Sequence, residues 1–163
     1  MGCDIHMYVE IKRDKKWENA DYFVVSDPLA EKPKLSLVEI YGHRNYALFA
    51  VLADVRNAGY DYIDAPRDIP DDATEFVKSE YDEWGWDAHS ASYFTLRELI
   101  DYHEEHKPRY HDWDDYILLP LIERLKNRAD DLYFIFNFQW GGRGREEALE
   151  KAKDIRIVFW FDN

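Results

Sequence analysis

Hydrophobic and polar residues alternate strictly from residue 3 to residue 12. The odd-numbered positions are hydrophobic, and the even-numbered ones carry the polar series Asp4, His6, Tyr8, Glu10 and Lys12. Because successive side chains of a strand point to opposite faces, this period of two predicts a β-strand. A polar run at residues 13–16 and a second hydrophobic stretch at 17–25 predict that the strand turns back as an N-terminal β-hairpin.

Helical spacing follows further along the chain. From Asn45 onward, hydrophobic residues recur near the i, i+3, i+4 pattern, and Gly59 stands where a helix would end. After a long irregular connection, Asp71 or Asp72 is expected to cap a short acidic helix that runs to Tyr81. These two stretches predict one helix that packs on the sheet and one that presents acidic residues.

Two more helices are expected in the second half of the chain. Thr95 followed by Glu98 is a capping box, which predicts a helix that runs to about residue 105. A helical pattern also covers residues 114–128, where Pro120 marks either a kink or a late start.

The last third of the chain predicts strand, helix and strand. Residues 132–138 and 155–161 are dense in aromatic and β-branched residues on both faces, which is typical of interior strands. A glycine-rich turn at 141–144 and a helical run at 145–153 separate them. The whole pattern favours an α+β or mixed α/β fold in one domain, residues 1–163. We expect a central, mostly antiparallel sheet with the N-terminal hairpin and three to five packing helices.

Composition and charge narrow the classes of function. With 163 residues, of which 46% are hydrophobic, the chain can bury a real core. Its formal net charge of −13 would repel a phosphate backbone, so general nucleic-acid binding is not expected. A small anionic ligand responds to the electrostatic field at its own site. The net charge therefore does not exclude a basic pocket within an acidic surface.

The hydrophobic stretches and the cysteine count indicate the cellular location of the protein. No stretch approaches 18 consecutive apolar residues, and the N-terminus lacks the pattern of a secretory signal. The single cysteine, Cys3, excludes an internal disulfide and a cysteine-based zinc cage. These features predict a cytoplasmic protein that does not bind membranes.

Two Asp-x-His pairs predict a metal site. Asp4 and His6 project from the same face of the first strand, and Asp87 and His89 repeat the spacing before the capping box. Carboxylate and imidazole groups at this spacing are suited to one divalent ion, with Zn, Mn and Mg as the candidates. We predict Asp4, His6 and His89 as metal ligands, with Asp87 and His89 as the catalytic pair. The alternatives are that Asp4 fixes the His6 ring by a hydrogen bond, or that both line a solvated sheet face.

A second set of residues is suited to an anionic ligand. Arginines near loops or helix ends, a helix start and neighbouring hydroxyl groups can hold a phosphate or a purine by forked hydrogen bonds and stacking. The predicted ligand contacts are Tyr8, Arg44, Asn45, Arg56, Arg67 and Ser90. Two alternatives stay open, because Asn45 can serve as a helix cap alone and the arginines can pair with Asp54, Asp64 or Asp68.

Several segments together resemble a group of small uncharacterised proteins encoded by bacteriophages and prophages. The segments are the opening Met1-Gly2-Cys3-Asp4-Ile5-His6, residues 44–46, 52–56 and 89–92, and the ending Val158-Phe159-Trp160-Phe161-Asp162-Asn163. The resemblance implies an accessory protein that acts in a bacterial host cytoplasm, where it interferes with a host defence signal. The inferred role in host defence rests on this resemblance rather than on the chemistry of the residues.

Three functions are compatible with these features. The first is metal-dependent hydrolysis of a phosphoester, with an arginine holding the substrate. The second is sequestration of a nucleotide-like ligand without turnover. The third is an acidic inhibitor that binds a basic site on a host protein. The sequence favours a small anionic ligand and leaves homo-oligomer formation open.

Overall fold

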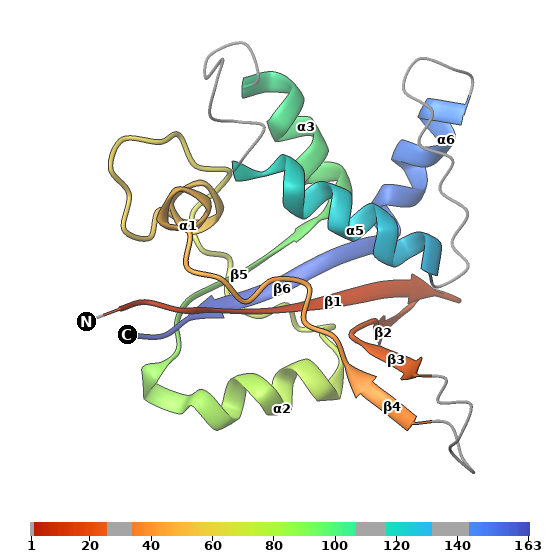
Figure 1. The fold of residues 1–163 in the computed structure, drawn as a ribbon, viewed down its shortest axis with the longest axis horizontal. Helices are drawn as coiled ribbons and strands as arrows, with labels where there is room; N and C mark the ends of the chain where they lie inside the picture. The colour runs from red at the N-terminus through yellow and green to blue at the C-terminus, as the bar shows by residue number, and fades with distance from the viewer. Residues whose placement is uncertain (1, 26–33, 107–116, 132–143) are drawn as a thin grey trace.

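The computed structural model describes residues 2–25, 34–106, 117–131 and 144–163 (Figure 1). Its central sheet has the strand order β2-β1-β6-β5, and all neighbouring strands are antiparallel. The strands are β1 (Ile5–Arg13), β2 (Lys16–Asn19), β5 (His89–Thr95) and β6 (Ile155–Phe161). A second, two-stranded sheet pairs β3 (Tyr22–Val25) with β4 (Lys34–Leu37). The predicted antiparallel sheet with an N-terminal hairpin is confirmed.

Helices cover both faces of the central sheet (Figure 1). On one face lie α1 (Tyr46–Ala53), α3 (Leu96–His106), α5 (Leu119–Asp131) and α6 (Gly144–Lys151). On the other lies α2 (Glu75–Trp84), followed by the short η1 (Gly85–Asp87), while η2 (Ala152–Asp154) leads into β6. The odd-numbered side chains of β1 face the first group, as the alternation predicts. The described part of the chain therefore has the predicted α+β fold.

The N-terminal hairpin ends earlier than the hydrophobic pattern predicts. Asp14 and Lys15 both have positive φ angles, of 48° and 66°, which is the geometry of the tight turns that join antiparallel strands. The return strand does not continue to residue 25, because the Asp21 carboxylate accepts the Val9 N–H at 3.0 Å. That side chain takes the place of a backbone carbonyl, so β2 ends and β3 pairs with β4 instead.

The start of α1 is confirmed, but its predicted end is wrong. The Asn45 side chain accepts the Leu48 N–H at 3.2 Å and caps the helix. The helix ends at Asp54, which is left-handed with φ 58° and donates its N–H to Ala50, rather than at Gly59. Aspartate tolerates this conformation better than most residues, so no glycine is needed there.

The predicted cap of the acidic helix is also wrong. Thr74, not Asp71 or Asp72, is the N-cap of α2, and its hydroxyl accepts the Val77 N–H at 3.4 Å. Asp72 is engaged elsewhere, since its carboxylate accepts hydrogen bonds from Arg156 and Trp17. The helix therefore begins later than expected and ends at Trp84.

Pro120 is the second residue of α5, a position at which proline is compatible with a helix. The predicted strand at 132–138, the glycines at 141 and 142 and the start of the 114–128 pattern lie outside the described residues. In the part of the chain that the structure describes, no helix is both long and apolar enough to cross a membrane.

The predicted capping box at the start of α3 is confirmed and can be tested. The Thr95 N–H donates to Glu98 at 2.8 Å, and the Glu98 N–H donates to the Thr95 hydroxyl at 3.2 Å. We expect Thr95→Ala to lower the free energy of unfolding by about 1 kcal/mol, because one helix N–H loses its acceptor. Urea denaturation measures the effect. Thr95→Ser keeps the hydroxyl and should retain most of the stability, so an equal loss in both variants would contradict the assignment.

Candidate functional site

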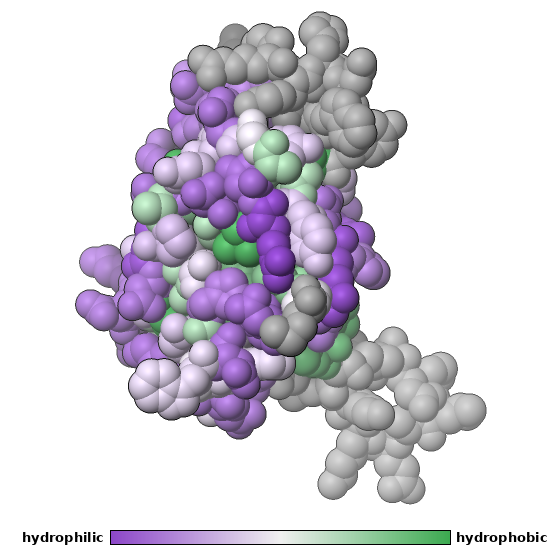
Figure 2. Space-filling model, turned by 90° about the vertical axis from the view of Figure 1, so that its left-hand side faces the viewer, coloured by the Kyte–Doolittle hydropathy of each residue, from purple (hydrophilic) through white to green (hydrophobic). Residues whose placement is uncertain are grey.

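The predicted metal ligands Asp4 and His6 lie where the two ends of the chain run side by side (Figure 1). Asp162 joins them, because one of its carboxylate oxygens accepts the Asp4 N–H at 3.0 Å and the other lies 3.2 Å from His6 Nε2. The carboxylate that holds His6 is therefore Asp162 rather than Asp4. The His6 ring also packs 4.0 Å from Trp84. Figure 2 shows this end of the molecule, where hydrophilic residues surround a small hydrophobic area.

The sheet separates His6 from His89. Both strands pair with β6, where His6 lies opposite Trp160 and His89 lies opposite Phe161. Because Trp160 and Phe161 are consecutive in a strand, they point to opposite faces, and so do the two histidines. No group of three or more histidine, cysteine or acidic side chains among the described residues is arranged to hold a metal ion. The two Asp-x-His pairs therefore do not meet at one site.

His89 interacts with the next residue instead. Its Nδ1 lies 3.1 Å from the Ser90 hydroxyl, and its ring stacks 6.0 Å from Phe161. An irregularity in the β5 ladder between His89 and Ser92, where Ser90 has a φ of 52°, allows neighbouring side chains to meet. Asp87 is exposed in η1 and makes no side-chain contact with His89 among the described residues. The predicted catalytic pair of Asp87 and His89 is thus not brought together.

Two of the predicted anion-binding arginines are paired with acids. Arg44 makes two hydrogen bonds to the Asp4 carboxylate in a solvent-exposed pair. Arg67 donates to Asp64 at 3.0 Å and to Glu98 at 2.7 Å. The acid-pairing alternative therefore holds for Arg67, through Asp64. Arg44 also pairs with an acid, but with the predicted metal ligand Asp4 rather than with Asp54, Asp64 or Asp68.

The remaining predicted ligand contacts have structural roles. Asn45 caps α1, and Arg56 lies against the buried thiol of Cys3. Burial raises the pKa of Cys3, and the nearby Arg56 opposes that rise. The Tyr8 hydroxyl donates to Glu80 at 2.9 Å and ties β1 to α2. Burial raises the pKa of Tyr8 well above its ordinary value, with Glu80 adding to the effect, so the hydroxyl stays protonated.

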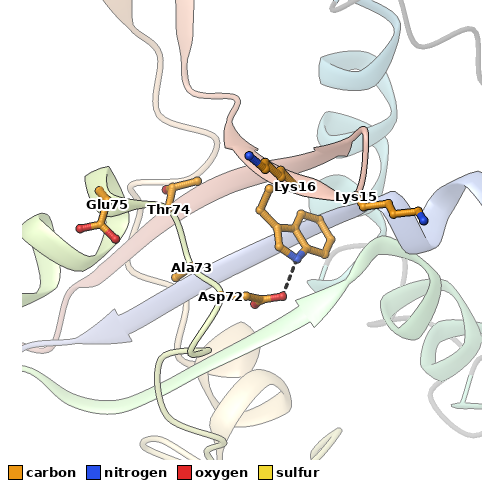
Figure 3. Close-up of a pocket in the computed structure, with 7 residues that line it drawn as sticks. Lys15, Lys16, Asp72, Ala73, Thr74 and Glu75 are labelled. Carbon is orange, nitrogen blue, oxygen red and sulfur yellow. Dashed lines mark hydrogen bonds between the residues drawn. The ribbon is translucent and has the colours of Figure 1, made fainter.

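The structure instead reveals a pocket at the β1–β2 turn, which we name the hairpin pocket. It has a volume of about 380 Å³ and is lined by Lys15, Lys16, Trp17, Asp72, Ala73, Thr74 and Glu75 (Figure 3). The hairpin supplies the two lysines and the indole, and the segment that leads into α2 supplies the other residues. In Figure 3, Lys16 extends toward the Thr74 side, whereas Lys15 extends in the other direction.

A buried network of ion pairs and hydrogen bonds joins one side of this pocket to the central sheet. Arg156, on β6, donates to Glu10 at 2.6 Å and to Asp72 at 2.7 Å, while Glu10 also accepts the Thr74 N–H at 2.7 Å. Glu10 and Arg156 are almost completely buried. The network therefore fastens the segment before α2 to the centre of the sheet.

Trp17 is held in a fixed orientation by the same network. The Arg156 guanidinium lies 3.9 Å from the centroid of the Trp17 ring, and the indole N–H donates to Asp72 at 3.0 Å. The dashed line in Figure 3 marks this second contact. Because one hydrogen bond and one ring face are already engaged, the indole is positioned before any ligand arrives.

The charges that line the pocket are not equivalent. Burial opposes ionisation of Asp72, but the hydrogen bond and charge of Arg156 outweigh it and hold the pKa of Asp72 below its ordinary value. Arg156 thus compensates that negative charge directly. Glu75 is largely exposed and lies 3.6 Å from Lys78. Lys15 and Lys16 have no partner among the described residues, so their charges are available at the pocket.

Sequence reasoning treated this segment only as a turn, although the sequence carries a signal. Lys12, Arg13, Lys15 and Lys16 place four cations within five residues, and Trp17 follows directly. In a chain with a net charge of −13, that run is a local basic spot beside an aromatic residue. The acidic side of the pocket is supplied from residues 72–75, which the hairpin pattern does not reveal.

Comparisons with protein families, curated proteins and solved structures found no match to this chain. The function is therefore inferred from the chemistry of the described residues.

Proposed function

We propose that this protein binds a small anionic, nucleotide-like ligand in the hairpin pocket. One observation carries the proposal, namely that two lysines without partners among the described residues and a positioned indole line the same pocket. Lysine ammonium groups attract phosphate oxygens, and an indole offers a flat surface to a base. The volume of about 380 Å³ lies within the range of small-molecule pockets.

The lining residues favour binding over turnover. Lys15, Lys16 and Trp17 supply charge and stacking, and the Thr74 hydroxyl already accepts a hydrogen bond as the cap of α2. The hydrolytic alternative would need His6 and His89 on one ion, and these lie on opposite faces of the sheet. From the lining of the pocket and the resemblance to small phage-encoded proteins, we infer that the protein sequesters a nucleotide signal in a bacterial host.

The proposal is tested by calorimetric titration with AMP, adenosine and inorganic phosphate. We expect AMP to bind with saturation and more tightly than adenosine, because the lysines contribute only when a phosphate is present. The double variant Lys15→Gln, Lys16→Gln should lower the affinity for AMP at least about tenfold, which corresponds to about 1.4 kcal/mol. The same variant should leave the affinity for adenosine nearly unchanged.

A matched control separates the pocket from the overall charge. Lys151→Gln, Lys153→Gln makes the same change in net charge on exposed residues of α6 and η2. This control should bind AMP as the parent protein does. Absence of saturable AMP binding, or an equal loss of affinity in both double variants, would rule out the hairpin pocket as the site.

A further inference from the structure

Trp86 is fully exposed to solvent. It lies in η1, between the end of α2 and the start of β5. On one side of it, the Trp84 ring packs 4.0 Å from His6, and on the other, His89 is already paired with β6. The residues on both sides of Trp86 are therefore anchored to the sheet. Large aromatic side chains exposed in this way are typical anchors of protein interfaces.

The helix that leads to Trp86 has two distinct faces. Val77 is buried against the sheet, in a hydrophobic cluster with Trp160 of β6. Phe76, Tyr81 and Trp84 pack against the same cluster. The outward side of η1 and the end of α2 is exposed and mostly acidic, with Asp82, Glu83, Trp86 and Asp87. We name these four exposed residues the α2 outer face. It combines one large aromatic side chain with three carboxylates.

The helix and turn that carry this face have a net negative charge. Residues 75–87 contain five Asp and Glu and one Lys, a net charge of −4. That lysine, Lys78, is itself engaged, since it lies 3.6 Å from Glu75. Asp82, Glu83 and Asp87 have no ionic partner among the described residues. Their negative charge is available to an approaching molecule.

We propose that the α2 outer face docks a basic protein surface, with Trp86 as the anchor and the surrounding carboxylates as the source of charge complementarity. An arginine or lysine of the partner can lie over the exposed indole, and an acidic rim accelerates association with a basic partner. The same charges repel nucleic acid. This proposal does not depend on the hairpin pocket, which lies at the opposite end of α2.

The test uses a fluorescein-labelled peptide of alternating arginine and glycine as the probe, followed by fluorescence anisotropy. We expect the intact protein to bind the peptide at low ionic strength, and the affinity to fall as salt is raised from about 50 to about 300 mM. Trp86→Ala should lower the affinity at least about tenfold, because the anchor is lost. Since Trp86 is fully exposed, this variant should fold as the parent does, which circular dichroism can verify.

Two charge variants make the test specific to this face. Asp82→Asn, Glu83→Gln should weaken binding and flatten its dependence on salt. Glu146→Gln, Glu147→Gln makes the same charge change on exposed residues of α6 and should leave the affinity within about twofold. If both variants bound the peptide equally weakly, the effect would be one of net charge alone. That result would overturn the proposal. An unchanged affinity in Trp86→Ala, or no binding at low salt, would also overturn it.

Lys15→Gln, Lys16→Gln should bind the peptide at least as well as the parent, because it removes positive charge far from the α2 outer face. Failure of AMP to bind therefore leaves this inference intact, and failure of the peptide to bind leaves the hairpin pocket intact.

Discussion

Glu10→Gln is expected to lower the free energy of unfolding by about 3–5 kcal/mol. Glu10 is fully buried, and its two carboxylate oxygens accept hydrogen bonds from Arg156 and from the Thr74 N–H. Glutamine keeps the shape but turns one acceptor into a donor, so either the Arg156 guanidinium or the Thr74 N–H faces an NH₂ group. In both cases the negative charge of Glu10 is lost, and Asp72 alone compensates the charge of Arg156. Urea denaturation at neutral pH measures the loss.

A double variant distinguishes the unpaired charge from a simple packing defect. In Glu10→Met, Arg156→Met both charges are removed together, and buried ion pairs replaced in this way often leave stability unchanged or higher. We expect most of the lost stability to return. If the double variant were as unstable as Glu10→Gln, the cost would lie in lost shape or in the Thr74 N–H rather than in an unpaired Arg156.

Asp21→Asn is expected to change how stability depends on pH. Asp21 is almost completely buried, and burial raises its pKa to about 6, although Val9, Asn19 and Arg128 act in the opposite direction. An unfolded aspartate titrates near pH 4, so between about pH 4 and pH 6 the folded state holds the additional proton. The contribution of Asp21 is therefore fully present below pH 4 and is lost as the pH rises through 6. For a shift of this size, the change is roughly 3 kcal/mol.

The difference in stability between the parent and Asp21→Asn isolates this group. Urea denaturation at several pH values from 4 to 7 should show the parent losing stability relative to the variant, because asparagine does not titrate. The exposed Asp71→Asn serves as the control and should show a difference that hardly changes with pH. A parent that gained stability relative to Asp21→Asn as the pH rose would mean that the charge of Arg128 outweighs burial.

Features that depend on neighbouring residues were predicted well. The alternation in β1 depends on the pleat of one strand, and the capping box at Thr95 and Glu98 closes within three residues. Asn45 was expected as a helix start for the same reason. The predicted end of α1 was wrong for a local reason. Asp54 adopts the left-handed conformation for which the prediction had required Gly59.

The predicted site residues are not brought together, for reasons that the local pattern could not reveal. Asp4 lies just before β1, and the carboxylate that holds His6 belongs to Asp162, 156 residues away. His89 points to the other face of the sheet because of its register with Phe161. An irregularity in a strand or a shift of one residue in pairing reverses the direction of a side chain, and composition does not reveal either.

The amino-acid sequence by itself determined the α+β class, the first strand, several helix starts and a basic run within an acidic chain, because these depend on contacts between near neighbours. The tertiary structure alone decided which distant groups meet: Glu10 with Arg156 across 146 residues, Trp17 with Asp72 across 55, and Trp86 left fully exposed. Such contacts follow from the free energy of packing the whole chain, in which register and burial outweigh the preferences of any short segment.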